Sequence, residues 1–367
     1  MARVGAPRLL EEFPEATERK HARTAKEILE ALRQAEGRDT AMLFSGDSGF
    51  YSGARMLLAE LEGEAPLLLP GISSLQVFSA RLKEPWQDWK LCSAHRKDCD
   101  PTAAVCEGKA AFFLTGGKLG PAELCIKLKE DGLGFLEAAA GENLGTPEES
   151  IRRGSVEEFA EQSFAPLSVL LVQPAPRAAR GCPGMPDGSF LREDGIPMTK
   201  QEVRAVILAK LNPGPDETCW DIGTGTGSVA VELATQARRV FSVERDEKAV
   251  ALADRNRRRF GAWNLRLVHG SAPEALSGLP TPDAAFIGGS GGTMRETVRM
   301  VFAANAKARV CASAVTLETL QEATETLKEL GFQTEVIQLA VSRSRKAGDL
   351  TMMTAQNPVF VITGTRG

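Results

Sequence analysis

The sequence is poor in the features that mark secreted, membrane-spanning or nucleic-acid-binding proteins. Its seven cysteines include no C-x-x-C pair, which is typical of reduced thiols in a cytoplasmic protein. No apolar run reaches the roughly 18 residues of a membrane-spanning helix, and no signal peptide is visible. The formal net charge of −4 argues against a general nucleic-acid binder. We therefore expect a soluble, cytoplasmic protein that binds neither nucleic acid nor membranes.

A metal site is not expected either. Cys92, Cys99 and Cys106 follow one another at intervals of seven residues, but Pro101 would interrupt any helix that contained them. The odd number of cysteines, without paired spacing, also fits free thiols rather than ligands. We interpret these cysteines as incidental and expect no metal ion.

The length and composition of the chain suit two globular domains. At 367 residues the chain exceeds one typical core, and its 43% hydrophobic and 25% charged residues are ordinary for a globular protein. Residues 173–188 contain four prolines and three glycines without periodicity, which indicates a connecting segment. The expected organisation is a first domain over 1–174, a linker over 175–190 and a second domain over 191–367.

The clearest motif of the second domain lies at 217–237. An apolar stretch over 217–222 predicts a strand, and the pattern over 228–237 predicts a helix. Glycine allows a tight turn between them and lets a ligand approach the backbone, while free N–H groups at a helix start favour polar or anionic ligand atoms. The candidate cofactor-binding residues here are Asp221, Gly223, Thr224, Gly225, Thr226 and Gly227.

The glycine spacing separates two classes of nucleotide ligand. A dinucleotide fingerprint reads G-x-G-x-x-G, whereas this loop reads G-x-G-x-G and has Ser228 at the third fingerprint position. A second expected strand ends in Glu244, about 20 residues later, where an acid can accept hydrogen bonds from ribose hydroxyls. Together these features resemble the S-adenosylmethionine (SAM) site of Rossmann-like methyltransferases. A glycine turn without a ligand is the plain alternative.

The rest of the second half alternates between expected strands and helices. After Glu244, strands are expected at 264–268, 283–287, 309–314, 333–341 and 358–363. This is the seven-stranded layout of a Rossmann-like methyltransferase. Thr199 is predicted to cap a helix that runs to about Leu211, with Glu202 completing a capping box. Thr199 is also a candidate cofactor-binding residue, and loops at two strand ends add the cofactor-binding candidates Gly270, Ser271 and Ala272 and the substrate-positioning candidates Gly289 and Ser290.

The first half is predicted to be α/β as well. Val4 and Gly5 have the pattern of a strand end, and a helical pattern covers 17–32. Further strands are expected at 40–45, 67–70, 110–115, 134–140 and 166–172. In open α/β sheets the ligand crevice lies at the carboxyl ends of the strands. The loops after the first two of these strands supply the candidate cofactor-binding residues Gly46, Asp47, Ile72 and Ser73.

Short stretches along the chain, taken in their sequence order, resemble one family. The second half resembles the C15-methylating, decarboxylating domain of corrin biosynthesis at 195–204, 221–227, 270–274, 286–292 and 357–359. The first half resembles a C5-methylating tetrapyrrole methylase at 45–51, 69–74, 85–89 and 142–146. In this order the stretches resemble the precorrin-6Y C5,15-methyltransferase (decarboxylating) family of cobalamin (vitamin B12) biosynthesis.

The resemblance implies SAM-dependent C-methylation of a precorrin macrocycle at C5 and C15, with decarboxylation of the C12 acetate side chain. A homo-oligomer, specifically a tetramer, is implied in the same way. The implied substrate has many carboxylates, so its pocket should present Arg and Lys side chains. The glycines at 288–292 suit a flat macrocycle. The substrate-positioning candidates are Lys200, Glu202, Arg204, Gly289, Ser290, Arg343, Arg345 and Lys346.

Three departures from the family pattern are visible. The first strand and the Gly-x-Gly-Pro-Gly loop with which tetrapyrrole methylases usually begin are both missing, so the first domain is expected to be truncated at its N-terminus. The loop after residue 45 reads Gly-Asp-Ser-Gly where the family commonly has Gly-Asp-Pro-Gly, and Ser271 stands where many methyltransferases have an acid.

Two alternative functions stay open. In the first, only the second half is an active C15-methyltransferase and the first half is a scaffold. In the second, the protein is a SAM-dependent methyltransferase of another molecule. For a nucleic-acid or amide acceptor the signal is missing, because Asn357-Pro-Val is not the recognition motif Asn-Pro-Pro-Tyr.

Overall fold

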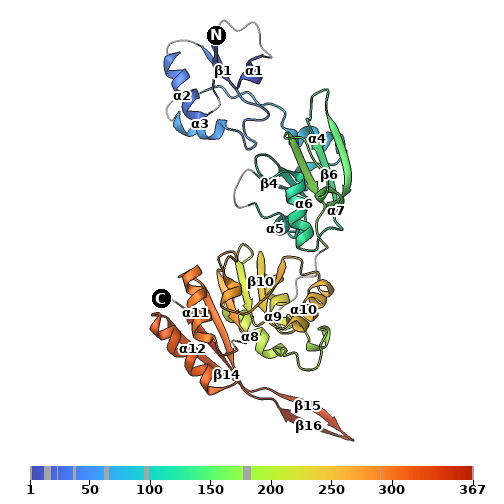
Figure 1. Ribbon diagram of the computed structural model, residues 1–367, viewed down its shortest axis with the longest axis vertical. Helices are drawn as coiled ribbons and strands as arrows, with labels where there is room; N and C mark the ends of the chain where they lie inside the picture. Colours follow the sequence, from blue (N-terminus) through green and yellow to red (C-terminus); the bar gives the residue numbers. More distant parts are fainter. Residues whose placement is uncertain are drawn as a thin grey trace. The chain divides into compact units, whose positions relative to one another are not determined.

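The computed structural model describes residues 2–11, 18–22, 24–35, 39–61, 66–94, 99–176, 183–289 and 291–365. The chain divides into two compact units (Figure 1). Unit 1 consists of Met1–Ala104, Lys109–Lys129 and Gly134–Gln173, and unit 2 consists of Val105–Gly108, Glu130–Leu133 and Pro174–Gly367. Each unit is described by itself below.

Unit 1 begins with a three-stranded parallel sheet of order β2-β1-β3. Its elements are β1 (Ala2–Gly5), α1 (Pro7–Glu11), β2 (Glu18–His21), α2 (Ala25–Gln34), β3 (Thr40–Leu43) and α3 (Ala54–Glu60). The expected strand end at Val4 and Gly5 is confirmed by β1. The helix expected over 17–32 is wrong in its first half, because β2 occupies that segment. Helix α2 starts later because Thr24 and Glu27 form a capping box, with N–O distances of 3.3 and 3.2 Å.

A five-stranded mixed sheet of order β4-β5-β8-β6-β7 forms the rest of unit 1. Its strands are β4 (Lys90–Ser93), β5 (Ala111–Leu114), β6 (Glu137–Glu142), β7 (Ser150–Ser155) and β8 (Ser168–Val172). The accompanying helices are α4 (Ser74–Leu82), α5 (Pro101–Val105), α6 (Pro121–Glu130) and α7 (Val156–Ala160). Phe78, Phe112 and Leu171 pack in the core between α4 and the sheet. The strand expected at 67–70 is wrong: it pairs with no strand, and Leu67 and Leu69 are exposed.

Unit 2 contains a seven-stranded sheet of order β11-β10-β9-β12-β13-β17-β14. Its strands are β9 (Thr218–Ile222), β10 (Arg239–Glu244), β11 (Leu265–His269), β12 (Ala284–Ile287), β13 (Arg309–Ala314), β14 (Gln333–Leu339) and β17 (Val359–Thr365). The first five are parallel, and β17 runs antiparallel between β13 and β14. The seven-stranded Rossmann-like layout predicted from the sequence is therefore confirmed.

The helices of unit 2 cover both faces of this sheet (Figure 1). They are α8 (Gln201–Leu211), α9 (Ser228–Ala234), α10 (Glu247–Arg259), α11 (Met294–Ala304) and α12 (Leu317–Glu329). Alternate strand residues enter two separate cores, since Cys219 packs with Val203 of α8 and Val229 of α9, whereas Trp220 packs with Val298 of α11. This alternation buries both faces of the sheet and leaves its strand ends to form loops.

The start of α8 differs from the sequence expectation. Lys200, not Thr199, is the N-cap residue, and it makes no side-chain cap hydrogen bond. Glu202 is paired with Arg343 instead of closing a capping box. The predicted capping box is therefore wrong, because a partner distant in sequence takes the carboxylate on which the local pattern depends.

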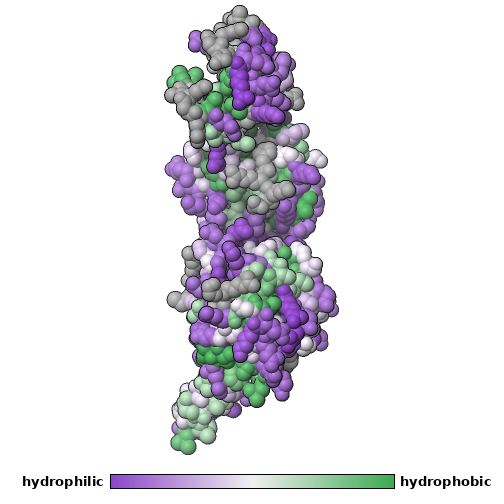
Figure 2. All heavy atoms as spheres, turned by 90° about the vertical axis from the view of Figure 1, so that its left-hand side faces the viewer, coloured by the Kyte–Doolittle hydropathy of each residue, from purple (hydrophilic) through white to green (hydrophobic). Residues whose placement is uncertain are grey.

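A two-stranded antiparallel hairpin was not expected from the sequence. It is formed by β15 (Ser342–Ala347) and β16 (Leu350–Ala355), which pair only with each other among the described strands. Leu350, Met352 and Met353 are all more than half exposed, and Figure 2 shows hydrophobic residues on the hairpin. Within the described part of the chain, no helix is long and apolar enough to cross a membrane.

Candidate functional site

A cavity of about 520 Å³ lies at the carboxyl ends of the parallel strands of unit 2. Small-molecule sites commonly occupy this position in open α/β sheets and commonly measure about 300–1,000 Å³. The lining residues come from the segment before α8 and from the loops that follow β9, β10, β11 and β12. They are Gly195, Ile196, Pro197, Thr199, Ile222, Gly223, Thr224, Val243, Glu244, Arg245, Asp246, Ala249, Gly270, Ser271, Ala272, Glu274, Gly288, Gly289, Gly291 and Thr293.

Two segments of the backbone, at Pro197 and at Gly289, pack closely against the glycine loop after β9. Gly223 and Gly225 both have positive φ values, of 78° and 53°. A Cβ atom on Gly223 would lie 2.5 Å from the carbonyl oxygen of Gly289, and one on Gly225 would overlap the carbonyl oxygen of Pro197. The Thr226 N–H donates a hydrogen bond to that Pro197 oxygen, at 3.1 Å. Glycine is therefore required here both by the backbone conformation and by the packing of the 195–199 segment across the loop.

Glu244 ends β10, and its carboxylate is held by the backbone. Oε1 accepts hydrogen bonds from the N–H groups of Arg245 and Asp246, at 2.8 and 3.0 Å, and Oε2 accepts one from Gly225 N–H, at 2.9 Å. A carboxylate has about four acceptor positions, so one position on Oε2 is left for a ligand. This geometry suits a hydroxyl donor in the cavity and ties the strand end to the glycine loop.

Asp221 supports the glycine loop from inside the sheet. Its side chain is fully buried, and Oδ2 accepts hydrogen bonds from the hydroxyls of Thr224 and Ser242. Burial raises the pKa of Asp221 to about 6, against the opposite effect of those two hydroxyls, and the charge of Glu244 raises it further. Asp221 is not among the lining residues, so its role in the geometry is to hold Thr224 in place.

The predicted cofactor residues of unit 2 meet at this cavity. Those that line it are Thr199, Gly223, Thr224, Glu244, Gly270, Ser271 and Ala272. Asp221, Gly225, Thr226 and Gly227 belong to the same turn but are not part of the lining. Among the predicted substrate residues, Gly289 lines the cavity. Lys200 is the N-cap of α8 and directly follows the lining residue Thr199, and Ser290 lies outside the described residues.

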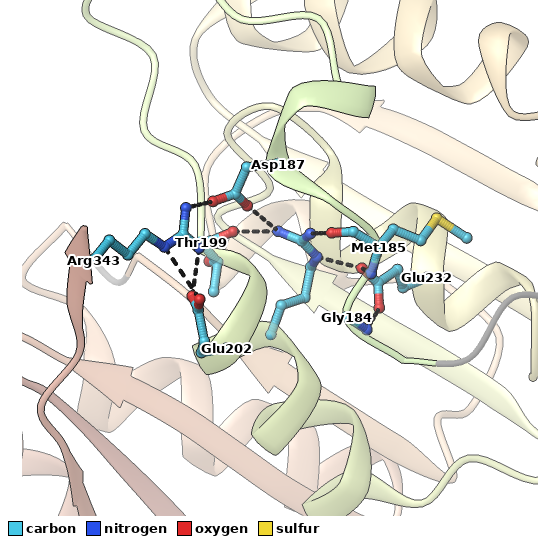
Figure 3. Close-up of polar contacts among 8 residues, drawn as sticks. Gly184, Met185, Asp187, Thr199, Glu202, Glu232 and Arg343 are labelled. Carbon is cyan, nitrogen blue, oxygen red and sulfur yellow. Dashed lines mark hydrogen bonds and ion pairs between the residues drawn. The ribbon is translucent and has the colours of Figure 1, made fainter. Parts of the chain in front are cut away.

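Arg204 lies outside the cavity, in a buried polar network. Figure 3 labels its partners Glu232, Thr199, Met185 and Asp187. Its side chain has no solvent exposure, and its guanidinium donates to the Glu232 carboxylate and to the carbonyl oxygens of Thr199 and Met185. A further contact joins its Nη1 to Asp187 Oδ1, at 3.4 Å. The charge of Arg204 is thus used within the protein, and one of its bonds fixes the backbone of a lining residue.

Arg343 reaches the same network from strand β15 (Figure 3). Its guanidinium forms a two-point contact with the Glu202 carboxylate and an ion pair with Asp187 Oδ2, at 3.0 Å. The hydrogen bond from Arg343 lowers the pKa of Glu202, and the same bond raises the pKa of Arg343. Arg345 and Lys346 are exposed on the same strand and do not line the cavity.

Several lining residues are absent from the sequence-based candidates. They are Gly195, Ile196, Pro197, Ile222, Val243, Arg245, Asp246, Ala249, Glu274 and Thr293, whereas Gly288 and Gly291 belong to the glycine run at 288–292 that was expected to suit a flat macrocycle. Arg245 and Asp246 directly follow Glu244, so their position after a strand end was the available signal. The contribution of Pro197 had no such signal, because its carbonyl oxygen approaches the glycine loop only in the folded chain.

The four candidate residues of unit 1 also lie close together. Gly46 has a φ of 73°, and a Cβ atom on Gly71 would overlap its carbonyl oxygen, so the loop after β3 packs against the turn before α4. Asp47 Oδ1 accepts a hydrogen bond from Gly49 N–H, at 2.6 Å. Ser73 caps α4 through a capping box, and Ile72 is 72% exposed. The structure thus forms one cluster from two loops that are separate in the sequence.

The sheet order, the cavity at the strand ends and the glycine turn define unit 2 as a Rossmann-like methyltransferase domain. Comparison with known families agrees with this class. The family described as "Precorrin methyltransferase domain" matches residues 189–366, and "Tetrapyrrole (Corrin/Porphyrin) Methylases" matches residues 3–160.

Individual relatives match either most of the chain or about half of it. The chain is 31% identical over 340 residues to a "Precorrin-6Y C(5,15)-methyltransferase [decarboxylating]" of Sinorhizobium sp., covering 90% of this chain and 81% of the relative. It is 44% identical over 185 residues to a "Probable cobalt-precorrin-6B C(15)-methyltransferase (decarboxylating)" of Pyrobaculum calidifontis, covering 49% of this chain and 95% of the relative. The chain belongs to the precorrin-6Y C5,15-methyltransferase (decarboxylating) family.

A solved structure entitled precorrin-6y C5,15-methyltransferase, from Geobacter metallireducens GS-15, is 37% identical and has a TM-score of 0.49. That alignment covers 52% of this chain and 100% of the other.

Proposed function

We propose that this protein transfers methyl groups from SAM to C5 and C15 of a precorrin macrocycle and decarboxylates the C12 acetate side chain, as a step of cobalamin biosynthesis. The observation that supports the C15 reaction best is the cavity of unit 2, where the glycine loop and Glu244 meet at one edge of the sheet. The C5 reaction is assigned to unit 1, which contains the tetrapyrrole methylase match.

The residues of the cavity fit SAM in size and in chemistry. A volume of about 520 Å³ is in the range of small-molecule sites. The free acceptor position on Glu244 Oε2 suits a ribose hydroxyl, and the backbone at Gly223 can be approached closely because it has no side chain. Gly270, Ser271 and Ala272 face the cavity from the next strand end, where backbone groups can meet an adenine edge. When bound, SAM supplies an electrophilic methyl group.

Positioning is the main task of this chain's own residues in methyl transfer. The nucleophile is a carbon of the macrocycle, so the reaction requires alignment and exclusion of water more than a general base. The position of a Cβ atom on Gly289 has no heavy atom within 4 Å, and this glycine lines the cavity. A flat ring could therefore lie against the backbone after β12. The 195–199 segment packs across the opposite side of the glycine loop and limits access of water there.

Calorimetric titration of the full chain with S-adenosylhomocysteine tests this proposal. Two sites per chain are expected, one in each unit, with Gly46, Asp47, Ile72 and Ser73 contributing to the site of unit 1. A single site that Gly225→Val abolishes would leave a C15-methylating unit 2 beside a scaffold. Absence of binding would overturn the proposal for both units.

Arg343, as a proposed carboxylate clamp, can be tested against its partner Glu202. Arg343→Gln should raise the KM for the tetrapyrrole more than it changes the affinity for S-adenosylhomocysteine. Glu202→Gln should lower that KM, because it frees a guanidinium that Glu202 now holds at two points. Equal effects of both substitutions on cofactor affinity, with no change in KM, would assign the pair to the support of α8 instead.

We also propose that the protein is a homo-oligomer, a tetramer by family resemblance. The exposed Leu350, Met352 and Met353 of β16 support an interface on the hairpin. Light scattering on the purified chain would show a tetramer, and a monomer at micromolar concentration would contradict the proposal.

A further inference from the structure

One cation lines the cavity of unit 2 without a side-chain partner among the described residues. Among the described residues that line the cavity, Arg245 is the only lysine or arginine. It follows Glu244 at the end of β10, and its side chain lies against the loop after β12. A Cβ atom on Gly291 would be 2.8 Å from Arg245 Nη1 and 3.3 Å from its Cζ. The guanidinium therefore occupies the space that a side chain at Gly291 would fill.

The charge of Arg245 is uncompensated in the described part of the chain, where its guanidinium has no hydrogen bond and no ion pair. Arg204 and Arg343 differ in this respect, because both are already paired with carboxylates of the protein. The backbone of Arg245 is fixed by two contacts: its N–H donates to Glu244 Oε1, and its carbonyl oxygen lies 3.0 Å from His269 Nε2. An arginine with a fixed backbone and an open guanidinium is suited to an anionic ligand group.

Two of the three acids of the described lining, Glu244 and Asp246, accept hydrogen bonds from backbone donors. Glu244 accepts three backbone N–H groups, and Asp246 Oδ1 accepts those of Lys248 and Ala249, at 2.8 and 3.4 Å. These carboxylates are directed at the loop and at α10. The position over Gly291 thus presents a positive charge on the side of the cavity that Gly288, Gly289 and Gly291 form.

We propose that Arg245 binds a side-chain carboxylate of the substrate and thereby selects a carboxylate-bearing ring. This inference rests on the proposed function, and the decarboxylating activity in the name of the Sinorhizobium relative requires that its substrate carry at least one such group. A guanidinium can contact a carboxylate at two points. Loss of a hydrogen bond to a charged group corresponds to roughly a tenfold to hundredfold weaker interaction.

The test compares Arg245→Gln with Arg238→Gln in the full chain. Arg238 is a matched control, because it is also exposed and immediately precedes β10 at the opposite end of the strand. The KM for the precorrin substrate is measured at saturating SAM, and the dissociation constant of S-adenosylhomocysteine is measured by calorimetry. Arg245→Lys is included because it keeps the charge and loses the two-point geometry.

The expected result is a KM at least tenfold higher in Arg245→Gln, with an S-adenosylhomocysteine affinity within twofold of the parent and an unchanged melting temperature. Arg245→Lys should recover part of the KM, and Arg238→Gln should match the parent. A KM within twofold of the parent would overturn the inference. So would an equal loss of S-adenosylhomocysteine affinity, since it would make Arg245 a cofactor-binding residue. A parent protein with neither turnover nor S-adenosylhomocysteine binding would instead show failure of the proposed function.

Discussion

Replacing Arg204 by methionine should destabilise unit 2 without disturbing its surface. Arg204 is completely buried, and its guanidinium donates to Glu232 and to the carbonyl oxygens of Thr199 and Met185, with a longer contact to Asp187 (Figure 3). Methionine is flexible and apolar, so it would fill much of the vacated volume. The effect of Arg204→Met should therefore come from the partners that it leaves behind.

The size of the effect follows from those partners. The Glu232 side chain is 1% exposed and, among the described residues, keeps only the hydrogen bonds from the N–H groups of Gly184 and Met185. Removal of one member of a buried ion pair typically costs about 3–5 kcal/mol, and Asp187 moderates the loss because it retains Arg343. We expect a loss of about 4 kcal/mol, which corresponds to roughly 10 °C in Tm for a domain of this size.

Urea unfolding of the full chain, followed by fluorescence, would measure this loss. Arg255→Met is the matched control, because Arg255 forms a surface ion pair with Glu193, at 2.6 Å, whose members are 56% and 47% exposed. It should cost about 1 kcal/mol or less. Adding Glu232→Met to Arg204→Met should recover part of the loss, since it removes the stranded charge. A single variant as stable as the control, or a double variant no more stable than the single one, would refute the reasoning.

Three further predictions concern the glycine loop and its neighbours. Because burial raises the pKa of Asp221 from 3.8 to about 6, its protonated form stabilises the fold at low pH and that stabilisation is lost as the pH rises through 6. Relative to Asp221→Asn, the parent's free energy of unfolding, derived from Tm, should fall by roughly 2 kcal/mol between pH 4 and pH 7; a difference independent of pH would contradict this. Gly225→Ala should abolish the S-adenosylhomocysteine site of unit 2 in calorimetry, whereas Gly278→Ala, also at positive φ but with open space around its Cβ position, should retain it. Glu244→Gln should weaken the same binding roughly tenfold or more by removing charge from the acceptor, and unchanged affinity in the folded variant would remove Glu244 from the site.

The sequence was most informative where local pattern and fold agree. The strand–glycine–helix motif and the acid at the end of β10 were both predictable, because their spacing follows from the geometry of one βαβ step. The two-sided burial of the sheet also appears in the sequence, as apolar runs such as 284–287. These features locate the glycine loop and the acid of the cavity lining without any tertiary information.

Elements without a buried face were not predictable from the sequence. All six residues of β16 are exposed, so no hydrophobic alternation distinguishes the strand from a loop. Strand β7 contains the polar run Ser-Ile-Arg-Arg-Gly-Ser and was missed for the same reason. The opposite error occurred at 67–70, where an apolar run beside proline was predicted to be a strand although Leu67 and Leu69 are exposed. A hydrophobic segment is predicted to be buried. Whether it is buried depends on which other segments of the chain pack against it.

Charge recognition shows the same limit at the level of single residues. The sequence identifies arginine as the residue type that a carboxylate-bearing substrate needs, but it does not show which guanidinium groups are already neutralised. Glu202 is 141 residues away from Arg343, and Glu232 is 28 residues away from Arg204, so neither pair has a local signature. Arg245 differs from both because its neighbours in the fold are glycines and its acidic neighbours are bound by backbone N–H groups. Arg245 can therefore meet the substrate as it stands, whereas Arg343 can do so only if it releases Glu202. The comparison of Arg245→Gln with Arg343→Gln at constant cofactor affinity separates the two positions.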